Sequence, residues 1–219
     1  MRIACCGIGL AVLACGVAYG QWVPVSSSQT TTLETVSAKG RVLSHQEQRQ
    51  QYYRKSDGSV LVQNLAQDGS NQPVSALLVD RGNSGRTYAL DYTHGSAVDK
   101  HQPAVAAAPK TRADLAAMEA HTRLQGDTVN GVSCVVAPVS LVNADGSKTV
   151  IGHVWLAPDY NYFVMKEDTL HPLRDGSYVH ITRQTQNLQA GTEPDSALFA
   201  KDKASVKRVR ALAAPHAKP

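Results

Sequence analysis

The side chains best suited to chemistry include one cysteine in the interior of the sequence. Cys134 stands in V-S-C-V-V, where it shares a strand face with Val132 and Val136. A nucleophilic thiol needs a neighbouring base, and no known family signature accompanies this cysteine. We therefore expect Cys134 to be a small buried hydrophobic residue, with an intermolecular disulfide as the alternative.

Two aspartates and two histidines lie close together in one short segment, at Asp91, His94, Asp99 and His101. Imidazole and carboxylate groups can hold a metal ion together. Their spacing matches no standard zinc pattern, and polar residues in loops are usually solvated. We predict no metal and no other cofactor, and a metal-assisted hydrolase using residues 91–101 is the weakest of three functional hypotheses.

Motifs of the common enzyme classes are missing from the sequence. The segment Gly82-Asn83-Ser84-Gly85 lacks the second spacer of G-x-S-x-G and lies between predicted strands, not at a strand-to-helix turn. The chain contains neither a phosphate-binding G-x-x-x-x-G-K nor the zinc motif H-E-x-x-H. We predict no catalytic residues and a protein that is not an enzyme.

The start of the chain, residues 1–20, has the pattern of a secretory signal peptide. Arg2 supplies the positive charge, an apolar run covers 3–17, and Ala18 and Gly20 are the small residues that signal peptidase requires. We expect cleavage after Gly20 and a periplasmic or secreted protein that is not transmembrane after cleavage. A membrane anchor is an alternative, but it needs about 20 apolar residues and usually stronger basic flanks.

Lipidation is a further alternative, because V-L-A-C at residues 12–15 would make Cys15 a lipidated N-terminus. Leu13 is a poor residue for such a site. Cleavage after residue 20 removes Cys5, Cys6 and Cys15 and leaves Cys134 alone. The mature chain then has no intramolecular disulfide despite its oxidising destination.

Positive charge is concentrated at the C-terminus. Residues 201–219 carry six Lys or Arg against Asp202, a net charge of +5, while residues 21–200 hold 15 basic and 17 acidic side chains, a net charge of −2. We predict a basic tail over 201–219 that frays in solvent, with an anionic component of the cell envelope as its alternative partner. The tail lacks the interleaved aromatic residues of single-stranded nucleic-acid binders, so no nucleic acid is expected.

The rest of the chain has the alternation and turn residues of an antiparallel sheet. Residues 21–35 are rich in Ser and Thr and are predicted to be a flexible leader. Turns are expected at Asp57-Gly58, 81–85, Asn130-Gly131 and 143–146. We predict a mainly β (α+β) fold, a strongly curved antiparallel sheet or incomplete β-barrel of about 9–11 strands with one or two short helices covering it.

Residues 94–122 interrupt this pattern. Two prolines and several alanines in 94–110 predict a linker, and 111–122 predict a short helix that carries Leu115 and Met118 on one face. This helix is expected to lie on the sheet or act as a lid. The whole of 36–200 is then a single domain.

Five segments in the expected order carry a resemblance to a known family. They are YYRKSDGSVLVQ, LLVDRGNSGRTYALDYTHGSAVD, LQGDTVNGVSC, HVWLAPDYNYFVMKED and ITRQTQNLQAGTEPDSALF, within 38–199. The chain resembles the LolA/LolB-like periplasmic β-protein superfamily, and most closely its uncharacterised exported members of acidobacterial type. The resemblance implies an incomplete barrel with helices across its open side, which shelters lipoprotein acyl chains in better-known members. No ligand-contacting residue of those members has a matching position here.

Our leading hypothesis is an exported, monomeric, non-catalytic carrier or sensor that holds a lipid or acyl chain inside the curved sheet. Its alternative is a structural or interaction protein of the cell envelope without a ligand. The lid would be Leu115 and Met118. The expected ligand cavity is lined by Val132, Cys134, Val136, Trp155, Phe163 and Met165.

Overall fold

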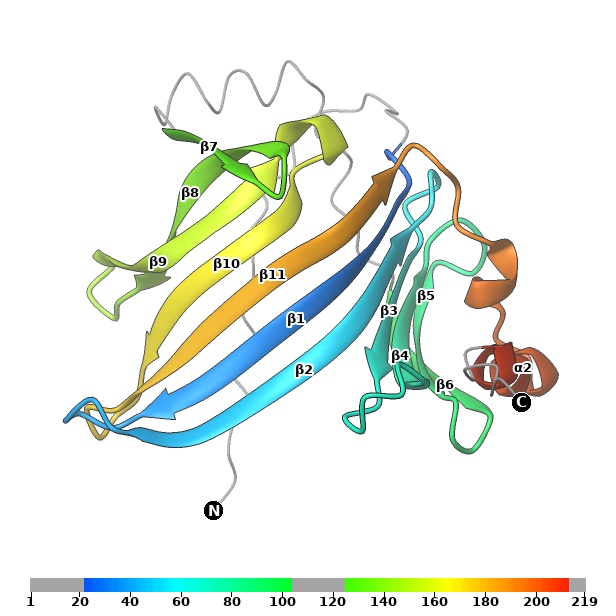
Figure 1. Ribbon diagram of the computed structural model, residues 1–219, viewed down its shortest axis with the longest axis horizontal. Helices are drawn as coiled ribbons and strands as arrows, with labels where there is room; N and C mark the ends of the chain where they lie inside the picture. Colours follow the sequence, from blue (N-terminus) through cyan, green and yellow to red (C-terminus); the bar gives the residue numbers. More distant parts are fainter. Residues whose placement is uncertain (1–21, 104–124, 213–219) are drawn as a thin grey trace.

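A computed structural model describes residues 22–103 and 125–212, and their strands form one antiparallel sheet (Figure 1). The sheet has eleven strands in the order β6-β5-β4-β3-β2-β1-β11-β10-β9-β8-β7. The strands are β1 (Val25–Val36), β2 (Val42–Arg54), β3 (Val60–Leu65), β4 (Pro73–Asp80), β5 (Arg86–Asp91), β6 (Ser96–Pro103), β7 (Gln125–Val129), β8 (Val132–Val142), β9 (Lys148–Ala157), β10 (Phe163–Pro172) and β11 (Tyr178–Ala190). The helical elements are η1 (Pro158–Tyr160), η2 (Ser196–Phe199) and α2 (Lys203–Leu212).

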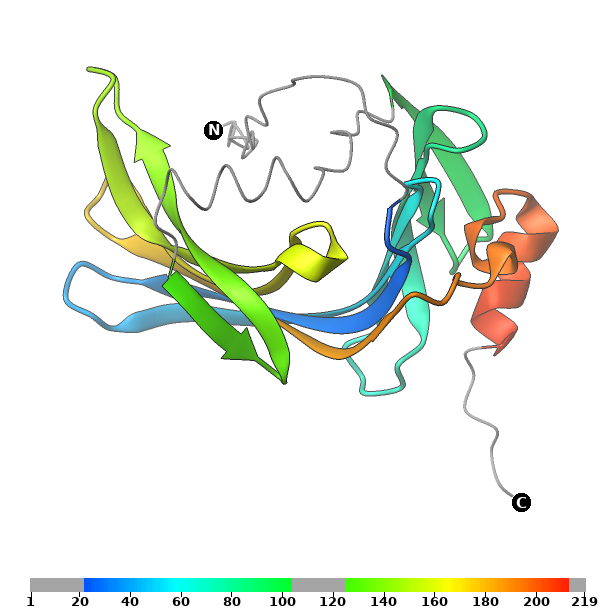
Figure 2. The same ribbon diagram turned by 90° about the horizontal axis from the view of Figure 1, so that it is seen from above.

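The sheet bends into an open trough, which Figure 2 shows from above. Strands β1, β2 and β11 make its floor, β3–β6 rise as one wall, and β7–β10 rise as the other. The edge strands β6 and β7 do not pair with each other, so the sheet is not closed. The predicted mainly β fold, with a strongly curved and incomplete barrel of this many strands, is confirmed.

Tight turns join neighbouring strands where the sequence predicted them. Asn130 and Gly131 both have positive φ angles, of 51° and 80°, as a type I′ turn between β7 and β8 requires. Gly58 has a φ of 83°, and the carboxylate of Asp57 accepts a hydrogen bond of 2.7 Å from the Ser59 backbone N–H. These two turns fix the register of their hairpins.

Residues 21–35 were expected to be a flexible leader, and this prediction is wrong for most of the segment. Val25–Val36 form β1, which lies in the middle of the sheet between β2 and β11. Val25, Ser27, Gln29 and Thr31 are buried in alternation with less buried neighbours. Threonine has a high β propensity, and this period of two is the mark of a strand whose one face is covered.

The predicted linker also needs correction at its start, because Ser96–Pro103 form the edge strand β6. An edge strand has a partner on one side alone, and this one is mostly exposed, so its polar residues show no hydrophobic alternation. Residues 104–124, with Leu115 and Met118 of the expected lid, lie outside the described residues. So do residues 1–20, with Cys15 of the alternative lipidation site.

The basic segment after residue 200 was expected to be a frayed tail, but its first half forms the helix α2. The Asp202 carboxylate accepts a hydrogen bond of 2.9 Å from the Ser205 backbone N–H and so caps the helix start. Val206 of α2 is fully buried. The helix lies on the outside of the trough (Figure 2), so it covers the convex face and not the concave face.

Buried apolar side chains form two clusters, one on each face of the sheet. The outer cluster joins β3–β5 to α2 and comprises Leu61, Ala76, Leu78, Leu90, Tyr92 and Val206. The inner cluster lies near η1 and comprises Val25, Val129, Cys134, Ala157, Phe163 and Met165. Within the described part of the chain, no helix is long and apolar enough to span a membrane.

Candidate functional site

The residues predicted to line a ligand cavity come together, but they pack against one another. Cys134, Phe163 and Met165 are buried members of the inner cluster, and Val132 and Trp155 pack against it while partly buried. The sixth residue, Val136, lies directly opposite Trp155 across the β8–β9 ladder. Side chains of the protein itself therefore fill this part of the trough.

The indole of Trp155 is held in place at the rim of the inner cluster. Its Nε1 donates a hydrogen bond of 2.7 Å to the Asp127 carboxylate, and the Lys166 ammonium lies 4.2 Å from the ring centroid. The hydrogen bond from Trp155 lowers the pKa of Asp127, and the backbone N–H of Thr128 adds to this effect. Both contacts keep the ring against the sheet.

A buried arginine ties the start of the described chain to the inner wall. Arg54 is 4% exposed, and its guanidinium lies 5.0 Å from the Trp22 ring centroid and 5.9 Å from that of Phe163. It donates hydrogen bonds to the backbone carbonyls of Val23 and Tyr160. Burial lowers the pKa of Arg54, and these carbonyls and aromatic faces stabilise its charge.

Apolar side chains cross the other wall of the trough in a single line. Tyr52 and Val62 are direct partners across β2 and β3, Leu77 follows on β4, and Ala89 and Val98 follow on β5 and β6. Tyr52 packs against the inner cluster, which places this line, the apolar row, on the concave face. Leu77 and Val98 are 45% and 55% exposed, so the row ends in uncovered apolar surface.

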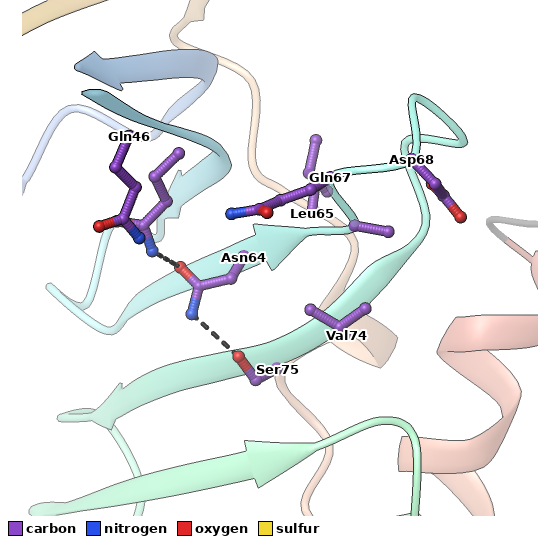
Figure 3. Close-up of a pocket in the computed structure, with 9 residues that line it drawn as sticks. Gln46, Asn64, Leu65, Gln67, Asp68, Val74 and Ser75 are labelled. Atoms are coloured by element: carbon purple, nitrogen blue, oxygen red, sulfur yellow. Dashed lines mark hydrogen bonds between the residues drawn. The ribbon is translucent and has the colours of Figure 1, made fainter. Parts of the chain in front are cut away.

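A second line, the amide row, runs parallel to the apolar row at a distance of two residues on each of the strands β2, β3 and β4. It consists of Gln50 on β2, Asn64 on β3 and Ser75 on β4, which are direct cross-strand partners. The Asn64 side-chain oxygen accepts hydrogen bonds of 2.8 Å from Gln48 and 2.9 Å from Gln50. Its amide nitrogen donates a bond of 2.9 Å to the Ser75 hydroxyl (Figure 3).

A cavity of about 490 Å³ opens beside the amide row. Figure 3 shows Asn64 of β3 and Gln67 of the turn after β3 close to the side chains from β2, whereas Asp68 of the same turn points away from them. The Ser70 hydroxyl and backbone N–H lower the pKa of Asp68 at the rim. The lining residues are Gln46, Gln48, Asn64, Leu65, Ala66, Gln67, Asp68, Val74 and Ser75.

The floor of the trough holds buried polar atoms whose hydrogen bonding is incomplete. Among the described residues, the hydroxyls of Ser27 and Thr31 and the Nε of Arg183 are buried without a hydrogen-bond partner. Thr31 and Arg183 are direct partners across β1 and β11, and Thr31 is also opposite Gln48. Unpaired buried polar atoms are costly, so each one calls for a specific explanation.

The four residues considered for metal binding form two separate pairs. His94 Nδ1 lies 2.6 Å from the Asp91 carboxylate, and Asp99 receives a hydrogen bond of 2.6 Å from Arg86. His101 Nδ1 lies 4.0 Å from Asp99. Within residues 22–103 and 125–212, no group of three His, Cys, Asp or Glu side chains is placed to hold a metal ion.

Sequence reasoning placed the candidate site on β8–β10 and missed the apolar and amide rows. The strand sequences V-L-V-Q-N-L and V-S-A-L-L-V carry apolar residues at nearly every position, so both faces of β3 and β4 looked alike. The structure separates the two faces: Leu61 and Leu78 belong to the outer cluster, and Val62 and Leu77 to the apolar row. Cross-strand register was the missing information.

The chain matches no protein-family model and no curated protein. Several solved structures are similar to it, and three of them are the following. A DUF1329 family protein from Desulfovibrio piger is 12% identical, with a TM-score of 0.33 and coverage of 82% of this chain and 90% of that one. A LolA superfamily protein from Nitrosomonas europaea is 10% identical, with a TM-score of 0.33 and coverage of 80% and 90%.

The third structure, from Vibrio parahaemolyticus, is provisionally described as an outer membrane lipoprotein-sorting protein domain. It is 13% identical, with a TM-score of 0.34, and the match covers 85% of this chain and 92% of that one.

Proposed function

We propose that this protein is an exported, non-catalytic carrier or sensor that binds the acyl chain of an amphiphilic molecule on the concave face of its sheet. The acyl chain would lie along the apolar row, over Leu77 and Val98. The observation that carries the proposal is the exposed apolar surface of these two side chains inside a trough, next to a row of fixed amides. Burying apolar surface stabilises a complex by about 25 cal/mol per Å².

The geometry fits an amphiphile better than a wholly apolar ligand. Val62 and Asn64 lie two residues apart on β3, and Leu77 and Ser75 two residues apart on β4. Side chains two positions apart on a strand share a face and are separated by about 7 Å. One molecule that has a chain and a polar head can therefore contact both rows at once.

Binding is tested by displacement of a fluorescent fatty acid from the purified protein. Leu77→Gln should raise the dissociation constant of a long-chain lipid about tenfold, because an amide replaces apolar contact surface. The matched control is Leu170→Gln, since Leu170 on β10 has nearly the same exposed fraction, 46%, and lies away from the apolar row. Equal affinities for the two variants, or no lipid binding by the unaltered protein, would refute the proposal.

A second candidate function is a structural or interaction protein of the cell envelope. The packed inner cluster favours it, because the residues expected to line a cavity fill the space themselves. Native mass spectrometry after gentle purification separates the two candidates. A co-purifying lipid favours the carrier, and a bare protein that also rejects added lipid favours the interaction protein.

Export is part of the proposal and has its own test. The intact mass of the exported form should correspond to a chain that starts at Gln21. A mass that includes a diacylglyceryl group on Cys15 would show lipoprotein processing instead.

A further inference from the structure

The cavity beside the amide row is lined by amide side chains without a Lys or Arg, and this lining indicates which headgroup a ligand would have. We infer that this cavity binds a neutral, polyhydroxylated headgroup, of the kind found in glycolipids, and disfavours phosphate and carboxylate headgroups. The inference rests on the proposed function, in which the acyl chain lies on the apolar row. The cavity, of about 490 Å³, is a hollow open to solvent, as suits a headgroup that is only partly enclosed.

The first argument is charge. The lining contains side-chain amides, one hydroxyl and the Asp68 carboxylate, but neither Lys nor Arg. Arg49, on the opposite face of β2, has its guanidinium engaged by the Ala66 carbonyl at 2.9 Å and by the Asn71 side chain at 3.1 Å. The lining therefore offers an anionic headgroup no cation, although the charge of Arg49 acts on Asp68 from the opposite face. Hydroxyl groups, by contrast, can donate to the amide oxygens of Gln46 and Gln67.

The second argument is the inventory of donors and acceptors. Each amide side chain presents both an N–H donor and a C=O acceptor, so it matches a hydroxyl group, which also donates and accepts. Asn64 is held in position, because it accepts from Gln48 and Gln50 and donates to Ser75, and these bonds leave it one N–H for a ligand. A site with fixed polar groups loses little entropy when a ligand binds.

The third argument is an unsatisfied hydroxyl on the same face. Thr31 is 7% exposed, its Oγ1 has no partner among the described residues, and it lies directly opposite Gln48 of the lining. A buried hydroxyl without a partner is costly, so Thr31 marks a polar stretch of the floor that continues the polar face of the lining from Gln48 to β1.

The test compares two lipids that have the same acyl chains, monogalactosyl diacylglycerol and phosphatidylglycerol, by competition against a fluorescent diacylglycerol, a probe without a charged headgroup. We expect the galactolipid to bind at least tenfold tighter. Asn64→Leu should remove this preference, and Gln67→Ala, in the exposed turn, should weaken it without a risk to folding. The control is Gln51→Leu, on the same strand as Gln50 but on the opposite face.

The outcomes separate this inference from the proposed function. Equal or tighter binding of phosphatidylglycerol, with both lipids weakened by Leu77→Gln, overturns the headgroup inference and keeps acyl-chain binding. If neither lipid binds, the proposed function fails. Methyl galactoside, a soluble sugar without an acyl chain, then tests whether the cavity binds a sugar by itself. If methyl galactoside binds to the unaltered protein but not to Asn64→Leu, the headgroup site is supported without the acyl-chain site. If methyl galactoside does not bind, the headgroup inference is overturned as well.

Discussion

The guanidinium of Arg54 donates a hydrogen bond of 2.7 Å to the backbone carbonyl of Tyr160, which lies 106 residues further along the chain. The same side chain holds the carbonyl of Val23 through two nitrogens. A single buried cation thus joins β2, η1 and the residues that precede β1. It fixes one end of the trough.

Replacement of Arg54 by methionine should therefore destabilise the protein. The variant keeps much of the apolar stem but leaves two partly buried carbonyls without their charged donor, and we expect a loss of about 3 kcal/mol in the free energy of unfolding. Urea denaturation measures this loss. Arg41→Met, at an exposed position beside the β1–β2 turn, is the control and should change little. Equal stabilities of the two variants would contradict the structural role of Arg54.

A matched pair of threonines tests the unsatisfied hydroxyl on the floor. Thr31→Val should raise the free energy of unfolding by about 1 kcal/mol, because it removes a buried hydroxyl that has no partner. Thr185→Val should lower it by about 1–2 kcal/mol, since the Thr185 hydroxyl is fully buried and donates a bond of 2.8 Å to the Val164 carbonyl. Thermal or urea unfolding gives both values. If the two substitutions change the free energy of unfolding in the same direction, the two hydroxyls do not differ in hydrogen bonding.

The thiol of Cys134, the one cysteine among the described residues, is expected to make the stability depend on pH. Burial raises the pKa of Cys134, so the folded protein keeps its proton where an unfolded chain would lose it. The thiol's contribution to stability is complete below the unfolded pKa of about 8.5 and decreases as the pH rises above it. Alkylation of the native protein at pH 8 should be much slower than alkylation of the urea-unfolded chain. Rapid labelling of the native protein would place the thiol at the surface.

Substitution of the same residue tests its burial independently. Cys134 is 2% exposed, and Cys134→Asp should cost several kcal/mol, about 3 or more, because a carboxylate without a partner would enter the inner cluster. Cys134→Ala should cost about 1 kcal/mol. Reducing agent should leave the melting temperature unchanged, and a decrease would point to an intermolecular disulfide.

Because of the ion pair between Asp80 and Lys201, we expect the stability of the protein to decrease at acidic pH. Burial by itself would raise the pKa of Asp80, but hydrogen bonds from Lys201 and Ser84 outweigh it and lower the pKa. The stabilisation is thus present above the usual pKa of about 3.9 and is lost as the pH falls through the lower folded value. Lys201→Met should cost about 2 kcal/mol at pH 7 and progressively less toward pH 3. Exposed Lys203→Met is the control, and a loss of the same size at both pH values would argue against the pair.

The sequence predicted the sheet better than it predicted the site. Turn residues such as Asn130-Gly131 require a specific backbone conformation, so the hairpins could be found from local sequence. β1 was missed because its core face is made of Ser27, Gln29 and Thr31, and a search for apolar alternation does not find a polar core face.

The helix α2 was missed for a different reason. Its positive charges suggested a solvated tail, although the Asp202 cap and the apolar residue Val206, which is buried, were visible in the sequence. The apolar row could not be predicted at all, since it depends on the register of five strands. No local pattern places Leu77 beside Val62 and Ala89.

The pairing of β1 with β11 has a consequence for the order in which the protein folds. Strands β1–β6 and β7–β11 are two meanders in which consecutive strands pair, and in the described sheet the β1–β11 ladder joins them. That ladder brings together residues such as Gln29 and Thr185, 156 positions apart, so its loop-closure entropy makes it a slow step. Each meander can form hairpins as soon as its residues are available. The trough, however, comes into being only when the last strand docks, and a chain that ends before Tyr178 leaves β1 and β10 as bare edges open to aggregation.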